Sequence, residues 1–172
     1  MLKTIASVAL IFLFTQTGCS QELMWSEVLA DVRKQHPEVV QLSTDSLFTW
    51  LLDKDRTQPL LVDIREKEEY AISHIHDAIQ MDPDTKEFSA LANLDKTQPI
   101  VVYCSVGYRS SKMAERLMAS GFTNVANLEG SIFTWANDGY PLATSGEKPA
   151  GVVHPYNKVW GMLLEKKYRG KP

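Results

Sequence analysis

Two apolar runs stand out from the otherwise mixed pattern of the chain, one at residues 60–64, interrupted only by Asp63, and one at residues 100–104. Runs of this length without polar alternation predict strands buried on both faces, as in a parallel sheet. Shorter strands are predicted at 39–42, 78–81 and 125–128. Helical spacing or capping signals predict helices at 22–35, 66–72, 87–94 and 110–120. Two further helices are predicted, one that ends at residue 52 and one that begins after residue 130. This alternation predicts an α/β domain with a mainly parallel sheet.

The pattern divides the chain into four parts. Residues 19–38 are predicted as a leading helix or linker, and residues 39–142 as the domain. Residues 143–172 lack periodicity at first and are predicted as a linker followed by a short terminal helix docked on the domain. The tail also contains His154, Tyr156 and Trp160. Two interpretations of these side chains remain open: they pack on the domain surface, or they form a lid beside the loop at residues 105–110.

The first part, residues 1–18, has the pattern of an export signal. Lys3 precedes an apolar run at 5–14, and small residues at 17–18 precede Cys19. The run is too short to span a bilayer comfortably, and its end resembles the lipobox of bacterial lipoproteins, although Gln16 stands where an aliphatic residue is usual. We expect an exported protein of the periplasm or cell envelope, attached to the membrane by acylation of Cys19, with plain signal cleavage as the alternative.

The composition and charge of the chain indicate a globular domain and give no sign of nucleic-acid binding. The chain has 172 residues, 44% of them hydrophobic and 23% charged, which suits one globular domain. A formal charge of −3 and the lack of a Lys/Arg run give no footprint for nucleic acid, so a nucleic-acid partner is not expected.

Cys104 is the main candidate for chemistry. It ends a predicted buried strand and is followed by a short Gly-containing loop and a predicted helix. If Cys19 is acylated or removed, Cys104 has no disulfide partner within the molecule. A free thiol in an exported protein predicts a reactive cysteine, whereas the alternative is a buried inert one.

The loop after Cys104 is suited to an anion. Gly107 allows it to curl so that backbone N–H groups converge, while Arg109 and a helix N-terminus lower a thiol pKa. Such a cradle stabilises a thiolate or the terminal sulfur of a persulfide. Phosphatases that use cysteine have five residues between Cys and Arg, whereas here there are four, which favours sulfur over phosphate. The predicted substrate-binding loop is Ser105, Val106, Gly107, Tyr108, Arg109 and Ser110.

Three ordered segments within 39–142 carry a family resemblance. They are Leu61-Val62-Asp63-Ile64-Arg65 with the segment through Ile79, the loop YCSVGYRSS, and Asn127-Leu128-Glu129-Gly130 through Leu142. On these motifs the chain resembles a single-domain rhodanese, a sulfurtransferase. Ser73 and Asp77 stand where glycines are usual, and Ser131 where a second glycine is common.

The resemblance implies a three-layer α/β fold with a five-stranded, mainly parallel sheet and a two-step reaction. Cys104 would take the outer sulfur of a donor such as thiosulfate, form a persulfide, and pass the sulfur to a thiophilic small molecule or a protein. No metal or organic cofactor is implied. Ser105 departs from members with Arg or Lys there, which weakens the case for thiosulfate.

Asp63 and Arg65 are interpreted as structural residues, because a carboxylate in a buried strand must be paired or hydrogen-bonded, and Arg65 or a loop N–H can satisfy it. The functional alternative is that they support the Cys104 loop. Two other functions remain open. The domain could be a sulfur carrier or protein-binding module with little turnover, or a thiol redox or phosphatase-like enzyme, which the short loop disfavours.

Overall fold

The computed structural model describes residues 16–146 and 148–171. Residues 1–15, most of the predicted export signal, lie outside the described residues. Cys19 falls within the first helix, α1 (Gln16–Gln35), and its acylation stays a prediction. Among the helices of the described segments, none has the length and apolar character needed to cross a bilayer.

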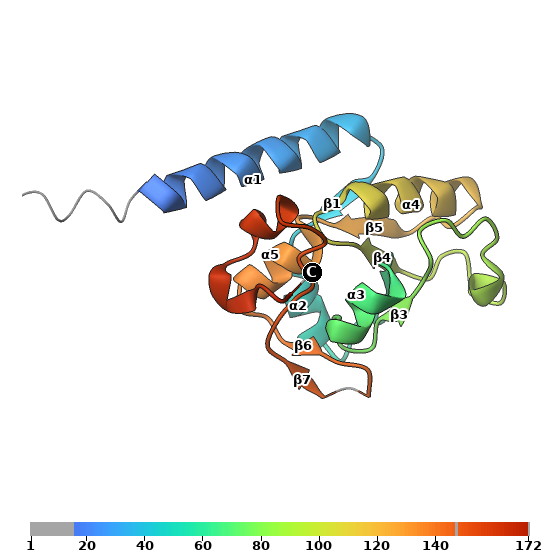
Figure 1. Cartoon of the computed structure of the whole chain (residues 1–172). Helices are drawn as coiled ribbons and strands as arrows, with labels where there is room; N and C mark the ends of the chain where they lie inside the picture. Colours follow the sequence, from blue (N-terminus) through green and yellow to red (C-terminus); the bar gives the residue numbers. More distant parts are fainter. Residues whose placement is uncertain (1–15, 147, 172) are drawn as a thin grey trace, which may run out of the picture.

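A parallel five-stranded sheet forms the centre of the domain, as the sequence predicted (Figure 1). Its strands lie in the order β1 (Val40–Leu42), β5 (Val125–Leu128), β4 (Ile100–Tyr103), β2 (Leu60–Asp63) and β3 (Ile79–Gln80). Each neighbouring pair is parallel. The chain moves outward from β2 to β3 and then returns to β4 on the other side of β2. The carboxyl ends of β2 and β4 therefore meet at a topological switch point, where ligands bind in sheets of this kind.

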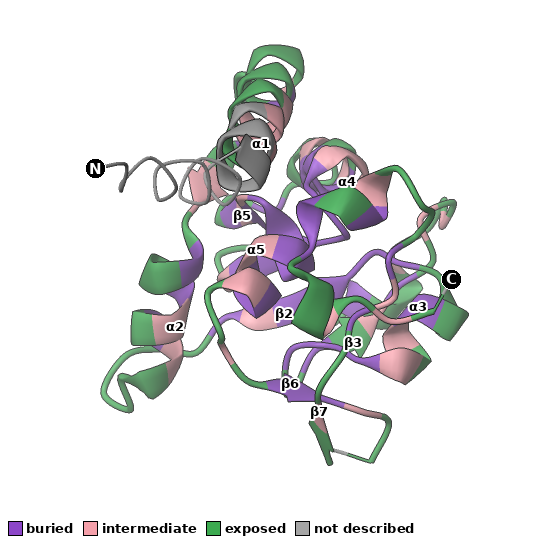
Figure 2. Ribbon diagram, turned by 60° about the vertical axis from the view of Figure 1, so that its left-hand side comes forward, coloured by how far each residue is buried: buried purple, intermediate pink, exposed green. Residues whose placement is uncertain are grey.

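Successive residues of β4 belong to two separate cores, which explains its unbroken apolar pattern. Val101 and Tyr103 join the core formed with α2 (Thr44–Leu52) and α5 (Ser131–Asn137). Ile100 and Val102 join the core formed with α4 (Tyr108–Ala119). The buried strands and the exposed outer faces of the helices are seen in Figure 2.

Three turns depend on positive φ angles at residues other than glycine, namely Asp77 (61°), Ser131 (52°) and Tyr156 (62°). Asp77 and Ser131 are two of the positions where glycine is usual in the family that the sequence resembles, and the structure keeps the left-handed conformation there despite the side chain. Ser73, the third such position, has an extended φ of −165°, so its backbone needs no glycine.

The segment predicted as a helix at 87–94 contains only a single 3₁₀ turn, η1 (Ser89–Leu91). Leu91 is its one fully buried side chain, so packing does little to stabilise a longer helix there. The short helix α3 (Lys67–Ile72) follows β2 as expected.

The C-terminal tail is more ordered than the predicted linker. Strand β7 (Pro149–Ala150) pairs antiparallel with strand β6 (Leu142–Ala143). The terminal helix is 3₁₀ rather than α: η2 (Trp160–Leu163) is followed by η3 (Lys166–Tyr168). Leu163 and Leu164 are buried in the core on the α5 side, so the terminal segment docks on the domain as predicted. Figure 1 shows this tail, in red, in front of α5.

Candidate active site

Cys104 lies at the carboxyl end of β4, at the floor of a cavity of about 340 Å³. Its side chain is free of disulfide bonding and is only 2% exposed. The cavity is lined by Cys104, Ser105, Val106, Tyr108, Arg109, Tyr156 and Trp160. Four of the six predicted loop residues, Ser105, Val106, Tyr108 and Arg109, therefore face this cavity beside the cysteine.

The other two loop residues hold the sulfur. The backbone N–H of Gly107 donates to Sγ of Cys104 over 3.2 Å, and the hydroxyl of Ser110 lies 3.4 Å from it. Gly107 is the N-cap of α4 and has a φ of 123°, a conformation that side chains other than glycine rarely adopt. Helix α4 therefore begins directly over the thiol, where its free N–H groups favour an anion.

The environment of Cys104 favours the thiolate. Burial opposes ionisation, but the charge of Arg109 and the hydrogen bonds from Ser110 and Gly107 outweigh it and hold the pKa of Cys104 below its ordinary value. A thiolate is the reactive form of cysteine. The arrangement therefore provides a nucleophile at the base of a substrate-sized hollow.

Replacing Ser110 by alanine removes one donor to this sulfur, so we expect the pKa of Cys104 to rise. Because only the thiolate is alkylated, the midpoint of the iodoacetamide rate against pH then moves to higher pH. Ser111→Ala is the matched control, since the neighbouring Ser111 hydroxyl is buried without a partner among the described residues. An equal shift in both variants, or none in Ser110→Ala, contradicts the assigned role of Ser110.

Helix α5 fixes the loop from the opposite side. The backbone N–H groups of Ile132 and Phe133 donate to the carbonyls of Cys104 and Ser105, each over 3.2 Å. The hydroxyl of Ser131 accepts from the N–H of Cys104 at 3.1 Å and lies 4.0 Å from Sγ. Ser131 was noted in the sequence only as a departure from glycine, and its direct contact with Cys104 was not predicted.

Arg109 is held by a buried carboxylate that the sequence did not reveal as a site residue. Its Nη1 and Nη2 donate to the two oxygens of Glu69 over 3.0 and 3.2 Å. Ser105 completes the group, since its hydroxyl donates to Glu69 over 3.1 Å and accepts from Arg109 at 3.0 Å. Burial opposes ionisation of Glu69, but Arg109 outweighs it and lowers the pKa of Glu69. No local spacing signals this pair, because 40 positions separate the partners.

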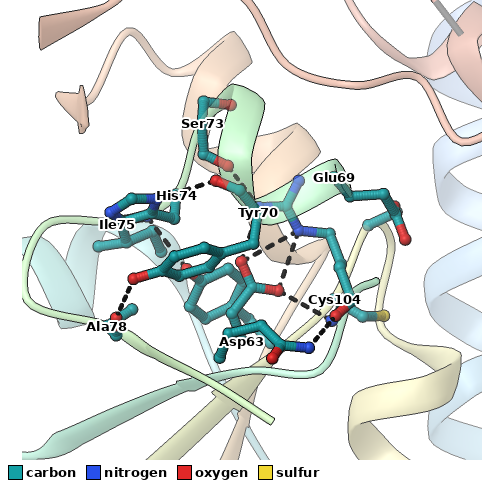
Figure 3. Close-up of polar contacts among 12 residues, drawn as sticks. Asp63, Glu69, Tyr70, Ser73, His74, Ile75, Ala78 and Cys104 are labelled. Atoms are coloured by element: carbon teal, nitrogen blue, oxygen red, sulfur yellow. Dashed lines mark hydrogen bonds and ion pairs between the residues drawn. The ribbon is translucent and has the colours of Figure 1, made fainter. Parts of the chain in front are cut away.

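Asp63 and Arg65 form a fully buried ion pair beside the loop, as the structural interpretation predicted. Arg65 Nη2 donates to Asp63 over 2.6 Å and to the carbonyl of Ser73 over 2.5 Å. Asp63 is paired in register with Tyr103, the residue before Cys104. Figure 3 shows this cluster and the labelled Asp63, Ser73, Glu69 and Cys104. The pair thus supports the end of β4 without facing the cavity.

The predicted lid alternative for the tail holds for two of its three residues. Tyr156 and Trp160 line the cavity, whereas His154 is not among the lining residues. Helix α1 also reaches the loop, since Val32 lies against Gly107 and Asp31 accepts from the hydroxyl of Tyr108 over 2.7 Å. The C-terminal part of α1 and the C-terminal tail therefore both pack beside the loop that follows Cys104.

Comparison with known proteins agrees with this geometry. A family model for the rhodanese-like domain matches residues 47–138. A sulfurtransferase from Allochromatium vinosum is 36% identical over 104 residues, covering 60% of this chain and 94% of that protein. A tRNA uridine(34) hydroxylase from Sodalis glossinidius is 33% identical over 102 residues, but the match covers 54% of this chain and only 29% of the hydroxylase.

Solved structures show the same fold. A rhodanese-like domain protein from Staphylococcus aureus has a TM-score of 0.53 and 30% identity, covering 62% of this chain and 98% of that one. A rhodanese-like domain from Anabaena has a TM-score of 0.56 and 25% identity, covering 66% and 87%. The described segments before 47 and after 138, including Tyr156 and Trp160, lie outside the matched family model. The chain belongs to the family of rhodanese-like domains.

Proposed function

We propose that this chain is a sulfurtransferase that moves sulfane sulfur from an anionic donor to a thiophilic acceptor through a persulfide on Cys104. One observation carries the proposal: a thiol with a lowered pKa lies at the floor of a cavity, with its sulfur accepting from the N–H of Gly107. The similarity to a sulfurtransferase over 94% of that protein supports the same reaction class.

In the first step the Cys104 thiolate attacks the outer sulfur of the donor. A new S–S bond forms, the donor's S–S bond breaks, and its electron pair leaves with the departing group, which is sulfite when thiosulfate is the donor. The N–H of Gly107 and the Ser110 hydroxyl stabilise negative charge on sulfur. In the second step the acceptor attacks the outer sulfur of the persulfide and restores the thiolate.

Arg109 contributes positive charge near the thiolate, but its guanidinium is already paired with Glu69. This pairing leaves less charge for a small dianion than an unpaired arginine would offer. Thiosulfate is therefore a test substrate here and is not proposed as the natural donor.

Steady-state kinetics test the proposal. With thiosulfate as donor and cyanide as acceptor, we expect parallel lines in double-reciprocal plots, because the persulfide separates two half-reactions. Sulfur uptake without turnover would favour the sulfur-carrier function instead. Hydrolysis of an aryl phosphate without sulfur uptake would favour the phosphatase-like alternative and contradict the proposal.

We also propose that the protein is exported and attached to the membrane through acylated Cys19, on the strength of the sequence pattern at 1–19. Mass spectrometry of the mature protein from its native host tests this directly. An acylated N-terminal Cys19 is the expected result, and an unmodified or retained leader contradicts it.

A further inference from the structure

Two aromatic side chains from the C-terminal tail form the outer wall of the active-site cavity. Tyr156 and Trp160 line it together with Val106 and Tyr108. The rings of Tyr108 and Trp160 are tilted at 60°, with centroids 5.9 Å apart. A donor that enters the cavity therefore meets three aromatic side chains, those of Tyr108, Tyr156 and Trp160.

The tail is anchored firmly enough to hold this wall in place. The carbonyl of Leu163 accepts from Gln21, Trp25 and Asn137, over 3.0, 3.2 and 2.8 Å respectively. Asn137 also accepts from the N–H of Glu165 over 2.9 Å. These contacts tie η2, which begins at Trp160, to α1 and α5.

Tyr156 stands between two hollows of different character. It lines the cavity in front of Cys104 and also a polar hollow of about 460 Å³ that includes Lys86, Lys112 and Arg116. Its ring lies 4.9 Å from the guanidinium of Arg109, within range of a cation–π contact. A φ of 62° is unfavourable for a tyrosine, which indicates that the surrounding contacts hold it there.

The pairing of Arg109 with Glu69 limits the positive charge available to a donor beside the Cys104 thiolate. Arg109 donates to both oxygens of Glu69, so it offers less charge to a dianionic donor than an unpaired arginine would. A second negative charge on the donor adds repulsion with the thiolate, and that repulsion is strong where water is excluded. A monoanion with an apolar body meets less repulsion and gains contact with the aromatic wall.

We propose that Tyr156 and Trp160 determine donor specificity and that the site favours organic thiosulfonates, R–SO₂–S⁻ with an apolar R group, over inorganic thiosulfate. This proposal rests on the proposed function. The Cys104 thiolate attacks the outer sulfur, the donor's S–S bond breaks, and its electron pair leaves on the sulfinate R–SO₂⁻. The products are the ionised Cys104 persulfide and the sulfinate, so two negative charges enter and two leave.

The test compares kcat/KM for benzenethiosulfonate and thiosulfate, with cyanide as acceptor, in the full chain. In Tyr156→Ala and Trp160→Ala we expect the ratio of the two values to fall about 5- to 10-fold, the size of a lost aromatic contact. Tyr156→Phe keeps the ring and should keep the ratio. Val159→Ala is the matched control, since Val159 adjoins Trp160 in sequence but is 64% exposed and is not a lining residue.

Glu69→Gln tests the charge argument separately, because glutamine keeps a hydrogen-bonding side chain but releases the charge of Arg109. We expect the ratio to shift toward thiosulfate in this variant. Methanethiosulfonate has the same reacting group without the ring. Its kcat/KM should therefore fall less than that of benzenethiosulfonate in Tyr156→Ala.

The outcomes separate this inference from the function on which it rests. If neither donor forms a persulfide on Cys104, the proposed function fails. If both form it and the ratio is unchanged in Tyr156→Ala and Trp160→Ala, the sulfurtransferase proposal stands and the specificity proposal is overturned. Tyr156 is 48% exposed, so its replacement leaves the core intact and the comparison valid.

Discussion

Replacing Cys104 by serine is expected to reduce sulfur transfer from thiosulfate to cyanide by about 10⁴-fold or more, as for loss of a catalytic nucleophile. A serine hydroxyl in the same place is not ionised near neutral pH and cannot form the persulfide. The measurement is initial-rate production of thiocyanate by the two proteins at equal concentration.

The substitution is nearly isosteric, and the donors to Sγ from Gly107 and Ser110 suit an oxygen as well as a sulfur. We therefore expect the urea midpoint to stay close to that of the wild type, which separates loss of chemistry from loss of fold. Residual transfer near the wild-type rate in a folded Cys104→Ser protein would refute the assignment of Cys104 as the nucleophile.

Replacing Asp63 by alanine is expected to destabilise the protein by about 3–5 kcal/mol, because it leaves the charge of Arg65 buried and unpaired. Both side chains are fully buried, and Nη1 of Arg65 already has no hydrogen-bond partner within the described part of the chain. Urea unfolding of the two proteins measures this loss.

A double variant, Asp63→Leu with Arg65→Met, provides the control. Removing both charges leaves no unpaired ion, so its loss of stability should be smaller than that of Asp63→Ala. Asp55→Ala, at an exposed loop position, should change stability by less than about 0.5 kcal/mol. If Asp63→Ala is no less stable than the double variant, the predicted cost of leaving the Arg65 charge buried and unpaired is contradicted.

The sheet and the position of Cys104 were predictable because their signals are local. The apolar runs at 60–64 and 100–104 are typical of strands buried on both faces, and the strand–loop–helix order placed Cys104 at a carboxyl end. The loop's glycine and arginine likewise indicated an anion site before any contact was known.

The remaining parts of the site depend on long-range contacts that local patterns do not encode. Glu69 lies in the first turn of α3, where an acidic side chain is favourable for the helix dipole whatever else it contacts, so nothing local indicates that it binds Arg109 of another element. The pattern near the C-terminus predicted a helix docked on the domain, but spacing alone identified neither its anchoring through Leu163 nor which of the two interpretations applied to Tyr156. Tertiary packing determined both.

Intact-mass measurement of the purified protein tests the central claim most directly. After incubation with thiosulfate or benzenethiosulfonate, we expect each chain to gain the mass of one sulfur atom, located at Cys104, and to lose it when cyanide is added. Cys104→Ser should gain none. No added sulfur with either donor, or an equal gain in Cys104→Ser, would contradict transfer through a Cys104 persulfide.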